Sequence, residues 1–141
     1  MIVIDASVWV SYLVSHDVHH RASVDWIDRG LESDGSFLAP VLLLAEVAGA
    51  VTRRTNDPLL GQQARAMFRA LPALTLVILD ELLGDQTADL AVRLRLRGAD
   101  ATYVAVAVQF GIPLVSWDGE HLSRAAAAVP VFTPSLVSFS R

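Results

Sequence analysis

Short, wholly apolar runs alternate along the chain with longer segments in which apolar residues recur every three or four positions. The short runs predict buried β-strands, and the longer segments predict helices. The predicted strands are Ile2–Ile4, Phe37–Pro40, Leu74–Leu79, Ile112–Ser116 and Pro130–Phe132. The predicted helices are Ser7–Val14, His19–Arg29, Val41–Thr55, Pro58–Ala70, Glu81–Arg97 and Ala99–Phe110. Gly98 and Gly111 follow the last two helices and are typical helix stops.

The alternation of strands and helices predicts an α/β fold. Strands that are joined through helices form right-handed crossovers, and these build a parallel sheet covered by helices on both sides. The composition, 53% hydrophobic, agrees with a sheet that is buried on both faces. We expect one domain over residues 1–141, with any ligand at the carboxyl ends of the strands.

A membrane protein is not expected. Charge, Gly or Pro interrupts every apolar stretch well before the ~20 residues that a membrane-spanning helix needs. The first residues carry no basic region, and Asp5 stands where a signal peptide would continue its apolar core. We therefore expect a cytoplasmic protein without a membrane partner.

Two residue types are missing from the sequence, and their absence excludes several kinds of site. The chain has no Cys, which rules out disulfides, thiolate metal sites and a Cys nucleophile. All 11 basic residues are Arg, so neither a phosphate-binding loop ending in Gly-Lys nor a Schiff-base lysine can form. The net charge of −4 does not exclude a nucleic-acid partner, because metal ions bound by clustered carboxylates would reverse the local charge.

Four acidic residues are expected to meet at one edge of the sheet. Asp5 follows the first strand directly, and Asp118 follows the strand that ends at Ser116. Glu46 lies in a strongly apolar helix, and Asp100 opens a helix whose body carries no charge. Buried carboxylates are very costly unless they are paired or coordinate a metal.

Each of these acids taken singly also has an ordinary structural explanation. Asp5 and Asp100 suit helix N-caps, Asp118 suits an Asp-Gly turn, and Glu46 could pair with a nearby Arg. Taken together, four converging carboxylates without a Lys would raise one another's pKa, and a divalent cation removes this conflict. Ligation by oxygen alone suits Mg²⁺ or Mn²⁺ better than zinc. Metal-assisted cleavage of a phosphodiester is the chemistry that such a site favours.

The same residues carry a resemblance to a known family. Asp5-Ala6-Ser7 after a strand, an isolated Glu in an apolar helix, Gly98-Ala99-Asp100-Ala101 and Ser116-Trp117-Asp118 are similar, in this order, to the PIN-domain ribonucleases. Within them, the chain most resembles the toxins of VapBC toxin–antitoxin pairs. The resemblance covers essentially the whole chain.

This resemblance implies a fold, an activity and a set of site residues. The implied fold is a three-layer α/β/α sandwich, and the implied activity is Mg²⁺- or Mn²⁺-dependent endonucleolytic cleavage of RNA. Asp5, Glu46, Asp100 and Asp118 would form the catalytic, metal-binding site, and Ser7 and Ser116 would support it. Ser116 stands where the family often has Thr, which keeps the hydroxyl.

Partners and substrate contacts are expected from the remaining residues. The arginines that end two helices suit either the helix dipole or the RNA backbone, and those expected to reach RNA are Arg53, Arg54, Arg93 and Arg97. The apolar helices Val8–Val14 and Val41–Val51 could supply a homodimer interface or a groove for a cognate antitoxin.

Other candidate sites and functions carry less weight. His16, His19, His20 and Asp17 are more typical of turns and caps than of a zinc site. We expect Glu120 to be solvated and His121 to lie close enough to touch substrate without being catalytic. Trp9, Trp26 and Trp117 are typical core or interface residues, although Trp117 adjoins an expected ligand. Aspartyl phosphatases and response regulators normally need a Lys, so the remaining alternative is a catalytically inactive PIN-like module that binds RNA or protein.

Overall fold

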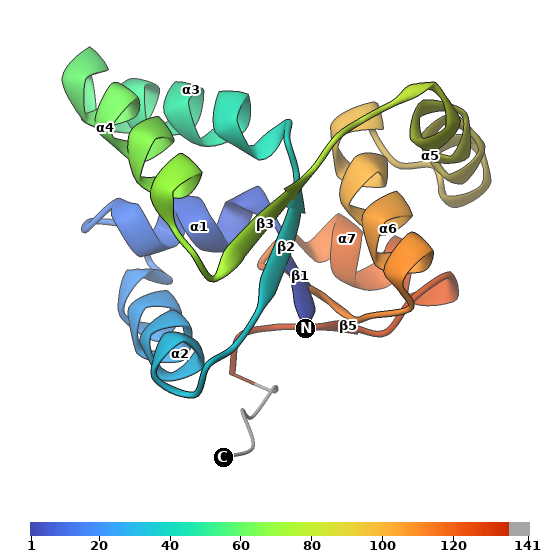
Figure 1. Ribbon diagram of the computed structural model, residues 1–141, viewed down its shortest axis with the longest axis horizontal. Coiled ribbons are helices and arrows are strands. Elements are labelled where there is room, and N and C mark those ends of the chain that lie inside the picture. Colours follow the sequence, from blue (N-terminus) through green and yellow to red (C-terminus); the bar gives the residue numbers. More distant parts are fainter. Residues whose placement is uncertain (136–141) are drawn as a thin grey trace.

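The computed structural model describes residues 1–135, and its centre is a five-stranded parallel sheet (Figure 1). The strand order is β3-β2-β1-β4-β5, and every neighbouring pair is parallel. The strands are β1 (Ile2–Ile4), β2 (Phe37–Pro40), β3 (Leu74–Val77), β4 (Leu114–Val115) and β5 (Val131–Phe132). The α/β fold with a parallel sheet is therefore confirmed.

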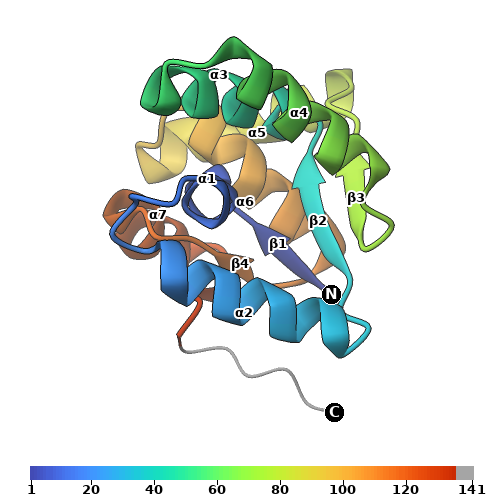
Figure 2. The same cartoon turned by 90° about the vertical axis from the view of Figure 1, so that its left-hand side faces the viewer.

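Helices cover both faces of this sheet and complete a three-layer sandwich. They are α1 (Ala6–Leu13), α2 (His20–Glu32), α3 (Leu43–Thr55), α4 (Pro58–Ala70), α5 (Glu81–Leu94), α6 (Gly98–Phe110) and α7 (Gly119–Arg124), followed by a short 3-10 turn at Ala125–Ala127. Helices α1 and α2 lie on one side of the sheet and α5, α6 and α7 on the other, with the α3–α4 pair beyond the end of β2 (Figures 1 and 2).

Local signals in the sequence set several helix ends. The Asp57 side chain accepts a hydrogen bond from Leu59 N at 2.9 Å, with Pro58 in the first turn of α4. Asp80 caps α5 in the same way, accepting from Leu83 N at 2.8 Å. Gly111 ends α6 with a φ of 65°, the left-handed conformation that glycine adopts without steric cost.

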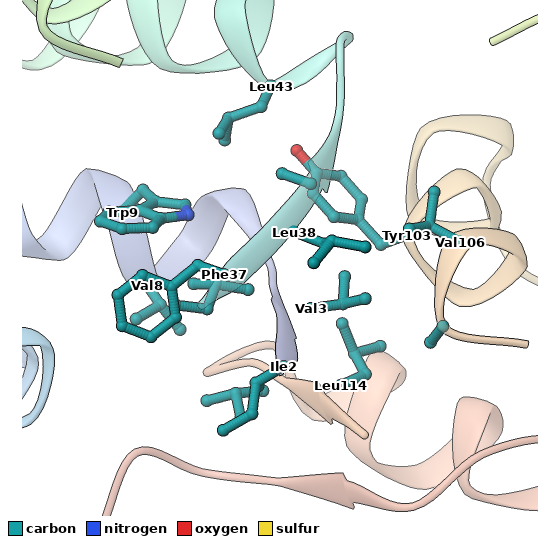
Figure 3. Close-up of a cluster of buried hydrophobic side chains, with 14 of the residues drawn as sticks. Ile2, Val3, Val8, Trp9, Phe37, Leu38, Leu43, Tyr103, Val106 and Leu114 are labelled. Atoms are coloured by element: carbon teal, nitrogen blue, oxygen red, sulfur yellow. The ribbon is translucent and has the colours of Figure 1, made fainter. Parts of the chain in front are cut away.

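The core fills both faces of the central strands. Val3, Leu38 and Leu114 turn toward Tyr103 and Val106 of α6 (Figure 3). On the opposite face, Trp9 of α1 packs edge-on against Phe37 and Phe68, with ring centroids 5.8 and 5.0 Å apart. All residues of β1 and β2 are buried, as a parallel sheet between helical layers requires.

Close packing of α3 on α4 fixes the helix that carries Glu46. A Cβ atom added at Gly61 of α4 would lie 2.0 Å from Thr52 Oγ1 and 2.7 Å from the carbonyl oxygen of Ala48. Only a glycine at this position lets the two backbones approach so closely. The α3–α4 pair therefore behaves as one packed unit over the carboxyl end of β2.

Several predicted boundaries are wrong: α2 continues to Glu32 instead of ending at Arg29, and the predicted strand Ile112–Ser116 is reduced to Leu114–Val115. Helix α5 ends at Leu94 rather than Arg97, because Arg95 adopts a left-handed φ of 55° and Leu96 turns into the core with 7% exposure. Gly98 is consequently the first residue of α6 and not a helix stop.

The predicted strand Leu74–Leu79 ends at Val77, which pairs with Pro40, the last residue of its neighbour β2. β3 is an edge strand, and within residues 1–135 it has no partner other than β2; past the end of β2, Ile78 and Leu79 are 75% and 40% exposed. Within residues 1–135, no helix is both long and apolar enough to cross a membrane.

Candidate active site

Asp5 lies at the end of β1 and is 5% exposed. Its Oδ2 accepts hydrogen bonds from Ser7 Oγ at 2.6 Å and from Ser116 Oγ at 2.9 Å, and Ser7 N lies 3.3 Å away. Burial raises the pKa of Asp5, but hydrogen bonding and charge from His121, together with the two serine hydroxyls, hold it below its usual value. Asp5 is therefore an ionised carboxylate inside the protein.

His121 of α7 is the buried cation that balances this charge. Its side chain is 0% exposed, with Nδ1 3.5 Å from Asp5 Oδ1 and Nε2 2.8 Å from the backbone carbonyl oxygen of Asp100. Burial lowers the pKa of His121, but Asp5 and Asp100 outweigh it and raise the pKa to about 9. At neutral pH the imidazole is protonated, and both ring nitrogens donate.

Asp100 and Asp118 form the outer part of the site. Asp118 follows β4 and caps α7, since its Oδ1 accepts from Glu120 N at 2.8 Å. Arg97 spans the two acids, with Nε 2.8 Å from Asp100 Oδ2 and Nη2 3.6 Å from Asp118 Oδ2. The Arg97 side chain is 72% exposed, so this cation lies at the rim of the site and meets solvent.

Glu46 reaches the site from the first turn of α3. Its Oε2 accepts a hydrogen bond from the hydroxyl of Tyr103, which comes from α6 across the sheet. Burial raises the pKa of Glu46, and the charges of Asp5 and Asp100 raise it further, against the Tyr103 hydrogen bond. Burial and the same group of carboxylates hold the pKa of Tyr103 well above its usual value. Side chains from three separate elements thus act on one another electrostatically.

All four acids line one open cavity of about 520 Å³ at the carboxyl edge of the sheet. This edge is where ligands bind in open parallel sheets. The other polar, charged or aromatic residues of the cavity wall are Ser7, Asp17, His19, Arg53, Arg54 and Trp117. The arrangement combines a negative floor with a wall that carries two guanidinium groups and two aromatic rings.

The chemistry of the donor set fits a hard divalent cation. Four carboxylates offer only oxygen, and Mg²⁺ is commonly held by one or two carboxylates while it keeps several waters. As they stand, no three carboxylates or imidazoles within residues 1–135 are close enough together to ligate one ion. Arg97, His121 and Tyr103 instead satisfy the acids from within the chain. The residues fit a water-rich Mg²⁺ or Mn²⁺ site and not a closed protein cage.

The structure brings most of the predicted site residues together. The four acids share the cavity, Ser7 and Ser116 bind Asp5, Arg53 and Arg54 lie in the wall, and Arg97 lies at the rim. Arg93 lies apart: it pairs with Asp89 at 3.1 Å and lines a separate hollow between α5 and α6.

The ordinary structural roles considered for the four acids hold for two of them. Asp5 and Asp118 do cap helices. Asp100 is not an N-cap, because Arg97 holds that position, and Glu46 binds Tyr103 rather than an arginine. The histidine group does not converge, because Asp17 pairs with Arg54 while the ring of His20 binds the backbone of Ser11 at 2.8 Å.

Sequence reasoning missed Tyr103 and misjudged His121. We expected His121 to touch substrate, but the side chain is wholly buried beneath the acids. Both residues stand three positions after a predicted acid, Tyr103 after Asp100 and His121 after Asp118. A spacing of three places two side chains on the same face of a helix, and this was the available signal.

Comparison with known proteins identifies the family. The PIN domain family model matches residues 2–128. Among solved structures, the chain is similar to VapC20 of Mycobacterium tuberculosis, which is described as a toxin that cleaves the sarcin–ricin loop. The two are 22% identical, the match covers 92% of this chain and 96% of VapC20, and the TM-score is 0.74.

Two further structures extend the comparison. FitAcB from Neisseria gonorrhoeae is 19% identical over 97% of this chain and 100% of its own, with a TM-score of 0.70. PAE2754 from Pyrobaculum aerophilum is 22% identical over 92% of this chain and 89% of its own, with a TM-score of 0.58. No curated protein matches the chain by sequence. With its acidic site at the carboxyl edge of a parallel sheet and a family match over nearly its whole length, the chain belongs to the PIN domain family.

Proposed function

We propose that this PIN domain is an endoribonuclease that depends on Mg²⁺ or Mn²⁺ and serves as the toxin of a toxin–antitoxin pair. One observation carries the proposal: Asp5, Glu46, Asp100 and Asp118 come from four separate places in the sequence and line a single cavity. Membership of the PIN domain family and the fold shared with the toxin VapC20 support it. An RNA substrate places the protein's action in the cytoplasm.

Asp5, Glu46, Asp100 and Asp118 would hold the metal. Bound there, the cation would lower the pKa of a water molecule and stabilise the charge that develops on the phosphodiester. Asp5 supplies a negative charge at neutral pH, because His121 and two serine hydroxyls lower its pKa. Burial and the charges of Asp5 and Asp100 raise the pKa of Glu46, so a bound cation would stabilise its charged form.

Cationic side chains around the cavity would position the RNA backbone. Arg53 and Arg54 line the wall, and Arg97 lies at the rim beside Asp100 and Asp118. A guanidinium group recognises phosphate through parallel hydrogen bonds. Arg54 already pairs with Asp17, whereas Arg53 forms no ion pair within residues 1–135. Arg53 is therefore the arginine most available to a phosphate.

The partners follow from the proposed toxin role. A nuclease toxin needs a cognate antitoxin protein that covers its site or displaces its substrate. Apolar residues that α1, α3 and α4 leave at the surface, among them Leu60 and Met67, line a hollow of about 320 Å³. This hollow could accept a helix of the antitoxin, and exposed apolar residues elsewhere, such as Val108 and Phe110, could serve a homodimer.

A second candidate function is a PIN module that binds RNA or protein without cutting it. One observation favours this function: Arg97 forms ion pairs with both Asp100 and Asp118. A protein cation in this place competes with a metal ion for the same oxygens. Metal dependence separates the two functions, because only the nuclease loses an activity in EDTA and regains it with Mn²⁺.

The decisive experiment uses protein freed of any copurifying partner and incubated with total tRNA and rRNA in Mg²⁺, Mn²⁺ or EDTA. Asp5→Asn should reduce cleavage at least about 100-fold, since it removes a charged metal ligand while keeping its shape. Asp85→Asn, an exposed acid on α5, is the matched control and should cleave normally. Discrete fragments that depend on metal and on Asp5 support the nuclease. Intact RNA with folded wild-type protein in both metals contradicts it.

A further inference from the structure

Beside the acids, two aromatic rings form a feature that the proposed metal chemistry does not use. His19 and Trp117 stack face to face, with ring centroids 4.0 Å apart and planes inclined by 5°. Both line the cavity that holds Asp5 and Asp118. Trp117 also immediately precedes Asp118 in the chain, so the stack adjoins the site directly.

Trp117 differs from the two other tryptophans of the chain. Trp9 and Trp26 are 0% and 1% exposed and fill the core, whereas Trp117 is partly exposed and lines the cavity. The core therefore does not require all of this side chain. An indole ring that is left partly exposed at the edge of an acidic cavity, with one face against the ring of His19, calls for another explanation.

Hydrogen bonds hold the indole ring of Trp117 in one orientation. Its Nε1 donates to Ser23 Oγ at 2.8 Å, and Ser23 Oγ lies 2.6 Å from Ser11 Oγ; both serines are buried. Its backbone N–H donates to Ser7 Oγ at 3.0 Å, and the same hydroxyl donates to Asp5. Ser7 thus ties the backbone of Trp117 to the carboxylate at the end of β1, while Ser23 holds the ring. A rigid platform of this kind binds a flat ligand with little loss of conformational entropy.

The wall of the same cavity also carries a charge that suits such a ligand. Arg53 has no acidic partner within residues 1–135, while its neighbour Arg54 is bound to Asp17. Asp17 also accepts a hydrogen bond from His19 N at 2.8 Å, which fixes the backbone that carries the His19 ring. An aromatic stack and a guanidinium without an acidic partner, both in the wall of one open cavity, match a base with its attached phosphate.

We propose that the His19–Trp117 stack is a nucleobase subsite, where one base of the bound RNA stacks while its phosphate lies within reach of Arg53. The inference rests on the proposed ribonuclease function. A base can join the stack only when its flat face is uncovered, and in an A-form duplex both faces are covered by neighbouring bases. Stacking tolerates every base, so the subsite selects unpaired RNA more than it selects a sequence.

The first test measures binding without cleavage. A fluorescein-labelled single-stranded octaribonucleotide is titrated in EDTA, and fluorescence anisotropy gives its affinity. Trp117→Leu should weaken binding about tenfold, because an aliphatic side chain removes a stacking surface. Trp117→Phe should keep most of the affinity. Arg93→Gln, in its separate hollow, is the control for general electrostatic effects and should bind as wild type.

The second readout reports the contact itself. Trp9 and Trp26 are buried, so an unlabelled octaribonucleotide should quench tryptophan emission mainly through Trp117. The quenching should disappear in Trp117→Phe although the RNA still binds. An octamer with abasic sugars and a blunt RNA duplex of the same length should both fail to quench the wild type. Cleavage assays should show a raised KM and little change in kcat for Trp117→Leu.

The outcomes separate this inference from the function on which it rests. If wild type cleaves RNA and Trp117→Leu binds and cleaves with the same affinity and KM, the subsite is wrong and the ribonuclease stands. If wild type cleaves nothing but the octamer still quenches through Trp117, the subsite stands and the activity is wrong. Equal quenching by the abasic octamer, or no binding by wild type, overturns the subsite.

Discussion

The inner and outer parts of the acidic site are built in opposite ways. In the inner part, Asp5 and His121 are almost wholly buried and are joined to Ser116 by hydrogen bonds and charge. In the outer part, Arg97 is 72% exposed where it meets Asp100 and Asp118. Solvent screens the outer ion pairs, whereas the buried charges depend on one another. The inner part is therefore fixed by the fold, and the outer part is free to exchange its partners.

The largest expected effect tests the inner part. His121→Leu removes the buried cation and leaves Asp5 buried with only serine partners, so we expect the free energy of unfolding to fall by about 3 kcal/mol. Urea denaturation in EDTA measures it. His121→Gln, which keeps an uncharged donor, should lose less, and Asp5→Asn combined with His121→Leu should recover part of the loss. A His121→Leu variant as stable as wild type would remove the distinction between the two parts.

The pH dependence of stability tests the interaction of His121 with Asp5. The pKa of His121 is about 9 in the folded protein, against 6.5 for a histidine side chain in its ordinary state, so the folded state binds this proton more tightly. The stabilisation is complete below about pH 6.5 and is lost as pH rises through 9, a loss on the order of 2–3 kcal/mol. Thermal unfolding between pH 6 and pH 10 measures it, and His121→Gln should lack this component.

A smaller effect is expected from a single hydroxyl of the inner part. Ser116 Oγ donates to Asp5 and accepts from Asp118 N at 2.9 Å, which joins the inner part to the outer part. Ser116→Ala should cost about 1–2 kcal/mol of unfolding free energy, and it should lower any metal-dependent activity about 10-fold or more. Ser123→Ala, an exposed serine on α7, is the control in both assays. Equal values for the two variants would contradict the role of the hydroxyl.

The smallest change in stability should come from the rim. Arg97→Gln removes both outer ion pairs but should leave the free energy of unfolding nearly unchanged, because the pairs are solvated. The same change removes a competing cation, so Mn²⁺ should bind several-fold more tightly by isothermal titration calorimetry. Arg93→Gln, whose ion pair with Asp89 is equally exposed, should leave Mn²⁺ binding unchanged.

The sequence predicted the parts of the site that depend on strand ends. Asp5 and Asp118 follow strands, and parallel strands bring their carboxyl ends to one edge whatever the details of packing. The roles of His121 and Tyr103 were not predicted, because they depend on how α6 and α7 pack on the sheet and no local sequence pattern indicates this packing. Leu96 explains the misplaced end of α5: local propensity continued the helix, but the core gained a leucine by ending it.

Aromatic residues show the same division between local and tertiary information. The sequence drew attention to Trp117 because it stands beside Asp118. It gave no sign of His19 as its partner, since the two residues lie far apart in the chain and meet only when α2 docks against the end of β4. Long-range contacts of this kind need the whole fold.

The strand order has a consequence for when the acidic site can assemble during synthesis. The central strand β1 is made first, yet one of its two neighbours is β4, with Val3 opposite Leu114. Until the ribosome has released that later segment, Asp5 has neither Ser116 nor His121 beside it. Chains fold during synthesis only as far as their contacts have emerged. A nascent chain from which residues 114–121 have not yet emerged therefore carries no assembled acidic site.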